Sequence, residues 1–211
     1  MPAPFSLTLR AARVVKQTPM FLTDDEQVRG LVGAALERFG RLDVMVNNAG
    51  SVGRPAALTE MDPEAFDRTL AINARGTFLG MKHALAPMLE RRSGAIVNVS
   101  SITAVTALPG LGAYAASKHA VIGLTRVGAV EGAAAGVRVN AVLPGPTATR
   151  MIGAEDFSGR VPLGRAADPA EPAAAICFLA SEAASFITGE SILVDGGMAY
   201  AEQGLETAGP R

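Results

Sequence analysis

Apolar residues recur at helical spacing between residues 24 and 40, and a short apolar run follows directly at 42–48. Thr23 followed by three acidic residues is typical of a helix N-terminus, and Gly40 is typical of a helix end. The run at 42–48 has the length of a strand. The face of the first helix that we expect to be buried consists of Val28, Leu31, Val32, Ala35, Leu36 and Phe39.

The alternation of longer helical segments with short apolar runs continues to residue 197. Helices are expected at 63–92, 112–134 and from 168 to about 184, and strands at 95–101, 137–144 and 191–197. Short strands that alternate with helices are typical of βα units around a buried parallel sheet. The predicted fold is therefore a doubly wound, mostly parallel α/β sheet with helices on both faces. In the helix at 63–92, the residues expected to face inward are Phe66, Leu70, Phe78 and Leu85.

The composition agrees with a packed protein and excludes several classes of function. With 211 residues, of which 49% are hydrophobic and 18% charged, the chain has the size of a single domain of ~150–200 residues. A net charge of -1 leaves no basic surplus for nucleic acid or anionic lipid. One cysteine can form neither an internal disulfide nor a zinc ligand set, so no metal site is expected. With no membrane span and no secretory signal predicted, a cytoplasmic location is expected.

Polar residues follow the predicted strands at three places: Asn47–Gly50, Ser100–Ser101 and Pro144–Thr149. Ligands of doubly wound sheets bind beyond the carboxyl ends of the strands. These three segments are therefore where chemistry is expected.

Tyr114 and Lys118 lie four residues apart in a predicted helix, so their side chains share one face. An ammonium about 4 Å from a phenol contributes ~4 kcal/mol at an effective dielectric of ~20, enough to lower the phenol pKa from ~10 by up to ~3 units. Such a pair could exchange protons with an alcohol or a carbonyl. Ser101, at the end of the preceding strand, could hydrogen-bond the same carbonyl. The alternative is that the spacing has only structural meaning, because any helix can carry such a pair by chance.

Six motifs follow one another along the chain: NNAG (47–50), INARG (72–76), IVNVSS (96–101), YAASK (114–118), VNAVLPGPTAT (139–149) and FITGESILVDGG (186–197). With these motifs in this order, the sequence resembles the short-chain dehydrogenase/reductase family over about residues 20–200.

The resemblance implies a catalytic group made of Asn73, Ser101, Tyr114 and Lys118. It implies that Tyr114 is the acid/base, that Lys118 lowers its pKa and binds the nicotinamide ribose, and that Ser101 orients the carbonyl. Asn73 would hold a water in the proton relay. The implied cofactor is NAD or NADP, with the choice left open. Its implied contacts, besides Tyr114 and Lys118, are Asn48, Ala49, Gly50, Thr147 and Thr149.

The N-terminal segment, residues 1–23, departs from the family pattern. The family begins with a glycine-rich turn between a strand and a helix, which holds the pyrophosphate, whereas residues 1–23 contain no glycine. Two βα units need about 50 residues, so we expect an N-terminally truncated member. Its single domain, 1–211, would comprise an atypical segment, 1–23, and a family-like core, 24–200. Either residues 5–15 fill the resulting gap beside the strand at 42–48, or that sheet edge is exposed.

Two functional hypotheses follow. The first is an NAD(P)-dependent oxidoreductase that interconverts an alcohol and a ketone or aldehyde, with weak nucleotide binding in this chain. The second is a catalytically silent, truncated relative that acts only in assembly. The expected partners are a small-molecule alcohol or carbonyl substrate and further copies of the chain, as a tetramer or dimer. The helix at 112–134 and the strand after Gly189 are the expected interfaces.

Overall fold

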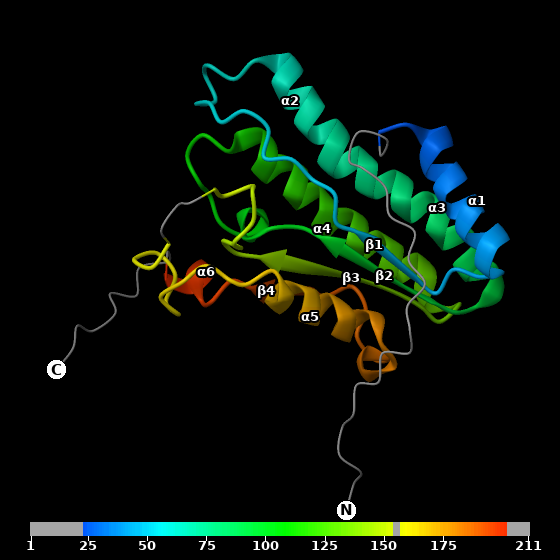
Figure 1. The fold of residues 1–211 in the computed structure, drawn as a ribbon. Helices are drawn as coiled ribbons and strands as arrows, with labels where there is room; N and C mark the ends of the chain where they lie inside the picture. Colours follow the sequence, from blue (N-terminus) through cyan, green and yellow to red (C-terminus); the bar gives the residue numbers. More distant parts are fainter. Residues whose placement is uncertain (1–22, 154–156, 202–211) are drawn as a thin grey trace, which may run out of the picture.

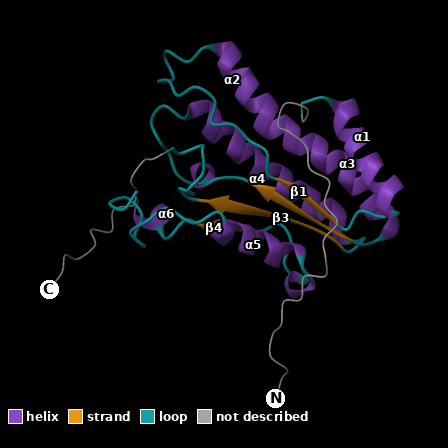
Figure 2. Cartoon of the chain, in the orientation of Figure 1, coloured by secondary structure: helices purple, strands orange, loops and turns teal. Residues whose placement is uncertain are grey.

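The computed structural model describes residues 23–153 and 157–201 of the chain. Within them, parallel strands form one sheet in the order β1–β2–β3–β4. Figures 1 and 2 show this sheet as a central layer between two layers of helices. The strands are β1 (Val44–Asn47), β2 (Gly94–Val99), β3 (Val137–Pro144) and β4 (Ser191–Val194). The prediction of a doubly wound, parallel α/β fold is confirmed.

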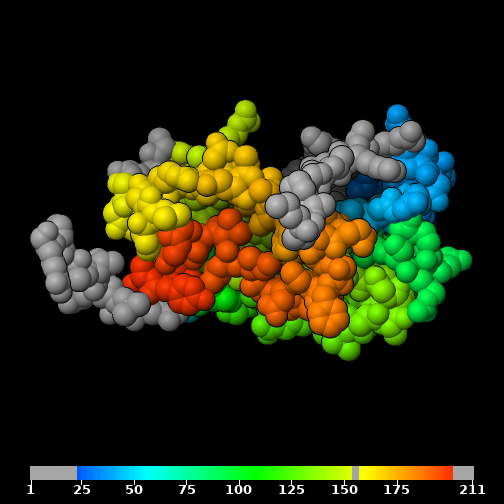
Figure 3. Space-filling view, turned by 90° about the horizontal axis from the view of Figure 1, so that it is seen from below, coloured from blue at the N-terminus to red at the C-terminus, as the bar shows by residue number. Residues whose placement is uncertain are grey.

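Three helices, α1, α3 and α4, lie on one side of the sheet, and α5 covers the other (Figure 1). Seen from the α5 side, the surface is formed mainly by the segment from α5 to α6, beside the loop that follows β3 (Figure 3). The α-helices are α1 (Asp25–Phe39), α2 (Pro63–Leu70), α3 (Gly76–Arg91), α4 (Gly112–Ala133), α5 (Ala170–Ala180) and α6 (Met198–Ala201). The shorter turns are a π-helical turn, η2 (Ala71–Arg75), and two 3-10 turns, η3 (Ile102–Ala104) and η4 (Glu182–Ala184).

Helix α1 begins and ends as its sequence predicts. The Asp24 carboxylate accepts a hydrogen bond from the Gln27 backbone N–H at 3.0 Å, and Gly40 ends the helix with a left-handed φ of 74°. Val28 and Val32 are buried. The Asp25 carboxylate binds Lys82 and His83 of α3, which joins α1 to the helix beneath it.

The segment 63–92 is not one continuous α-helix, because the π-helical turn η2 separates α2 from α3. The prediction that Phe78 faces inward is wrong, since its side chain is 46% exposed. The inner face of α3 instead carries small residues, among them Gly76, Gly80 and Ala84. A Cβ at Gly80 would come within 2.0 Å of the Asn47 Oδ1, so the helix packs more closely on β1 than a large apolar side chain permits.

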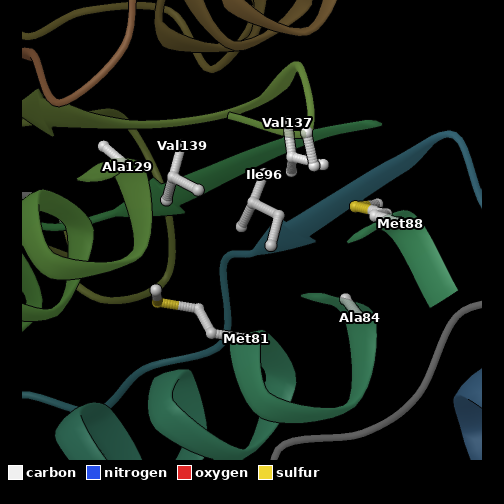
Figure 4. Close-up of a cluster of buried hydrophobic side chains, with 8 residues drawn as sticks. Met81, Ala84, Met88, Ile96, Ala129, Val137 and Val139 are labelled. Carbon is white, nitrogen blue, oxygen red and sulfur yellow. The ribbon is translucent and has the colours of Figure 1, made fainter. Parts of the chain in front are cut away.

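A cluster of apolar side chains between the helices and the sheet forms the main core (Figure 4). Side chains of α3 and α4 meet those of β2 and β3 there, as the labelled residues Met81, Ala84, Met88, Ile96, Ala129, Val137 and Val139 show. A second apolar layer lies between α5 and the opposite face of the sheet. The sheet centre is thus covered on both sides.

Polar side chains cross this interior in one connected chain. Asn47 Nδ2 donates to Asn98 Oδ1 at 2.8 Å, and Asn98 Nδ2 donates to Thr125 Oγ1 at 2.9 Å. The Thr125 hydroxyl in turn donates to the Val121 carbonyl at 2.7 Å. Because these polar atoms are paired, their burial is compatible with a stable core.

Candidate active site

The candidate site lies where β1, β2 and β3 end, beside the N-terminal half of α4. The turn after β1 carries Asn48 to Ser51, and Ser100 and Ser101 follow β2. Helix α4 begins at Gly112 and brings Tyr114 and Lys118 to the same edge. The Ser100 hydroxyl donates to the Lys118 carbonyl at 2.8 Å, which ties the helix to the end of β2.

The Lys118 side chain is buried beneath this edge, with only 4% of the residue exposed. Its Nζ donates to the Val99 carbonyl at 2.8 Å. Burial lowers the pKa of Lys118 from 10.5 to about 8, because a charged ammonium is costly away from water. At pH 7 the group is still mostly protonated, and two of its three hydrogens remain for other acceptors.

The Tyr114 ring lies beside this ammonium, with the Lys118 Nζ 5.6 Å from the ring centroid. Burial raises the pKa of Tyr114 above 10.0, and a hydrogen bond with Ser101 acts in the opposite direction. The spacing of the two residues predicted a lowered pKa for the phenol. The pKa of Tyr114 is raised and not lowered because desolvation of the phenol outweighs the effect of the Ser101 hydrogen bond. The Lys118 Nζ hydrogen-bonds the Val99 carbonyl.

Asn73 lies in the π-helical turn η2 and is fully buried. Its Oδ1 accepts from the Ser51 backbone N–H, and its Nδ2 donates to the Ser51 carbonyl, both at 2.8 Å. The same Nδ2 donates to Ser117 Oγ at 2.9 Å. π-Helical turns occur frequently at functional sites, and here the turn aims the Asn73 side chain at both the β1 turn and α4.

The turn after β1 approaches these side chains closely at Gly50. A Cβ at this position would lie 3.2 Å from Asn73 Oδ1 and 3.3 Å from Lys118 Nζ. Only a residue without a side chain fits here without displacing one of them. Asn48, two residues earlier, is exposed and free to meet a ligand.

The structure brings Ser101, Tyr114, Lys118, Asn73 and Gly50 together. Ala49 belongs to the same turn as Gly50. Thr147 and Thr149 lie apart, on the loop after β3, where the Thr147 hydroxyl donates to the Gly145 carbonyl at 3.1 Å and Thr149 is exposed.

Sequence reasoning did not single out Ser117, which is fully buried between Asn73 and Tyr114. Its place within YAASK, directly before the lysine, was the available signal.

Among the described helices, none combines the length and the apolar character that a membrane span requires. Within residues 23–153 and 157–201, no three His, Cys, Asp or Glu side chains are grouped so that they could hold a metal ion.

Comparison with known proteins identifies the family. A family model described as enoyl-(acyl carrier protein) reductase matches residues 8–199. The chain is 41% identical over 183 residues to the 3-oxoacyl-[acyl-carrier-protein] reductase of Thermotoga maritima, covering 84% of this chain and 74% of that protein. Among solved structures, levodione reductase matches with a TM-score of 0.83 and 36% identity, over 86% of this chain and 76% of that one. ElxO with NADP bound matches with a TM-score of 0.81 and 40% identity, over 85% and 76%.

The chain is therefore an enzyme of the NAD(P)-dependent oxidoreductase class. It belongs to the short-chain dehydrogenase/reductase family, as its motifs predicted.

Proposed function

We propose that this protein interconverts an alcohol and a ketone or aldehyde, with Tyr114 as the acid/base. The observation that carries the proposal is the buried group at one sheet edge, in which the Tyr114 phenol hydrogen-bonds Ser101 and lies beside the Lys118 ammonium. A proton donor, a second hydroxyl and a positive charge in one place suit a carbonyl oxygen that gains negative charge during reduction.

The residues of this edge fit the nicotinamide end of NAD or NADP. Lys118 keeps two hydrogens for ribose hydroxyls, and Gly50 leaves room beside its Nζ that a side chain would fill. Asn48 and Ala49 extend the same turn, and Thr147 and Thr149 are proposed to meet the nicotinamide. When bound, the nicotinamide supplies or accepts the hydride.

Each side chain then has one task. The Ser101 hydroxyl orients the substrate oxygen, and the Tyr114 hydroxyl gives that oxygen a proton in reduction or takes one in oxidation. Lys118 stays protonated at pH 7 and stabilises the phenolate left by proton donation. Asn73 fixes the β1 turn through its two bonds to Ser51.

The decisive experiment is Tyr114→Phe, assayed for carbonyl reduction with nucleotide at about 10 mM. We expect activity to be lost while the circular dichroism spectrum is unchanged, because only the proton donor is removed. Tyr200→Phe is the matched control, since Tyr200 is the other tyrosine of the chain and is 61% exposed. Ser101→Ala is expected to cost less than Tyr114→Phe. More than a tenth of the wild-type rate in Tyr114→Phe contradicts the assignment.

The other candidate from the sequence, a catalytically silent relative that acts only in assembly, is tested by nucleotide affinity. Residues 1–23 contain no glycine to form a phosphate-binding turn. Losing two or three charge-assisted hydrogen bonds, at ~1.5–3 kcal/mol each, weakens binding by roughly two to six orders of magnitude. We therefore expect dissociation constants of about 1 mM or weaker for NAD(H) and NADP(H) with the 211-residue chain. A micromolar constant in calorimetric titration contradicts this candidate.

We also propose that the chain self-associates, as a tetramer or dimer, through α4 and the region of β4. Val127 and Val130 of α4 are exposed, as is Phe186 just before Gly189 and β4. Exposed large apolar side chains at both expected interfaces are typical of surfaces that another copy covers. Sedimentation velocity at micromolar concentration tests this proposal, and a lone monomer would refute it.

A further inference from the structure

The Ser117 hydroxyl is a buried polar group to which the proposed chemistry assigns no task. The residue is 0% exposed and lies one position before Lys118 in α4. Its Oγ donates to the Tyr114 carbonyl at 2.7 Å and accepts from Asn73 Nδ2 at 2.9 Å. It thus joins α4 to the π-helical turn.

These bonds fix the orientation of the Asn73 amide. A hydroxyl has one hydrogen, and that of Ser117 is used on the Tyr114 carbonyl, so its oxygen can only accept. Asn73 must therefore present its Nδ2 to Ser117. Its Oδ1 is then left facing the Ser51 N–H, and its second amide hydrogen goes to the Ser51 carbonyl. Both hydrogens of the amide are engaged.

The Ser51 backbone, held in this way, places the neighbouring Gly50 against the site. The Cβ position of Gly50 lies only 3.2 Å from Asn73 Oδ1 and 3.3 Å from Lys118 Nζ. A small displacement of Ser51 would therefore change the space beside the Lys118 ammonium, where the ribose is proposed to bind.

We propose that Ser117 is a positioning residue that holds the turn Asn48–Ser51 against Lys118 by fixing the Asn73 amide. The proposal rests on the proposed function for its effect on turnover. Its effect on the turn is independent of any activity.

The test compares Ser117→Ala with Ser100→Ala. Both changes remove a buried serine hydroxyl that bonds a carbonyl of α4, Tyr114 in one case and Lys118 in the other. Only Ser117 also bonds Asn73.

In Ser117→Ala the Ser51 amide hydrogen is expected to exchange about tenfold faster, and the KM for nucleotide to rise about tenfold with a smaller change in kcat. Ser100→Ala should leave the exchange of Ser51 unchanged. Ser117→Thr, which keeps the hydroxyl, should restore both readouts.

An unchanged Ser51 exchange rate in Ser117→Ala overturns the proposal, whatever the activity. Equal effects in Ser117→Ala and Ser100→Ala also overturn it, because they would indicate general loosening of α4. If the Ser51 amide exchanges faster but the KM for nucleotide is unaltered, Ser117 holds the turn without affecting nucleotide binding, and that part of the proposal is overturned. If the wild-type chain has no turnover, the proposed function fails, and the exchange measurement alone decides the role of Ser117.

Discussion

Strands β1 and β3 have similar apolar sequences, VMVN and VRVNAVLP, but different surroundings. β3 pairs with β2 on one side and β4 on the other, and Val139 and Val142 are fully buried. In the part of the chain that is described, β1 pairs only with β2, and Val44 and Val46 are 37% and 40% exposed. The burial of an apolar strand is therefore decided by its neighbours in the sheet as well as by its own residues.

The backbone of β1 shows which of its peptide groups face away from β2. The Asp43 carbonyl accepts from the Ala95 N–H at 2.9 Å, on the β2 side. Peptide groups alternate in direction along a strand, so those of Val44 and Val46 face away from β2. Whether residues 5–15 cover this edge stays a prediction, since they lie outside the described residues.

The largest expected effect is the difference between two identical truncations, Val142→Ala and Val46→Ala. The first leaves a cavity in a buried strand and should lower the free energy of unfolding by about 2–3 kcal/mol. The second removes half-exposed atoms and should cost about 0.5 kcal/mol or less. Urea unfolding monitored by circular dichroism measures both. Equal losses would mean that β1 is as well covered in solution as β3.

The pH dependence of the free energy of unfolding should show a smaller effect, which comes from the buried Lys118. Its pKa is about 8 in the folded protein and 10.5 as the ordinary value, so between these pH values the unfolded chain binds more protons. The free energy of unfolding should therefore rise by about 2 kcal/mol between pH 8 and pH 10 relative to Lys118→Met. Lys82→Met, which removes a surface ammonium from α3, controls for loss of charge. A constant difference between wild type and Lys118→Met would refute the lowered pKa.

The smallest effects come from two glycine-to-alanine changes in helices. In α4, beside β3, a Cβ at Gly132 would lie 2.8 Å from the Val137 carbonyl oxygen, so Gly132→Ala should destabilise by about 1–2 kcal/mol. In the outer helix α1, a Cβ at Gly30 meets nothing within 4 Å, so Gly30→Ala should stabilise by about 0.5–1 kcal/mol. Thermal unfolding midpoints give the signs. If both variants changed the unfolding midpoint in the same direction, the proposed difference in packing between α4 and α1 would be wrong.

The sequence predicted the order and type of the main elements, because apolar periodicity reports directly on which face of a segment is buried. It failed at Phe78, since hydrophobicity favours the large side chain while close packing of α3 needs Gly80 and Ala84. The π-helical turn around Asn73 also escaped prediction. The extra residue of a π-helical turn shifts the apolar pattern of the segment 63–92 by only one position, which an irregular apolar pattern hides.

At the site, helical spacing and strand ends indicated that Tyr114, Lys118 and Ser101 share one edge, and the structure brings the three residues together there. The sequence did not predict the direction of the Tyr114 pKa, because desolvation depends on how many distant segments cover a side chain. Sequence reasoning also assigned no role to Ser117, because its hydroxyl bonds Asn73, which lies 44 residues away in the chain.

The hydrogen bond between Asn47 and Asn98 has a consequence for how the strands find one another during folding. The two residues are direct partners in the register of β1 on β2. A slip by one residue would set Asn47 opposite a valine, either Val97 or Val99, and leave a buried amide without its partner. This one polar contact penalises the misaligned pairings and so selects the alignment that carries Asn48 and Gly50 to the site.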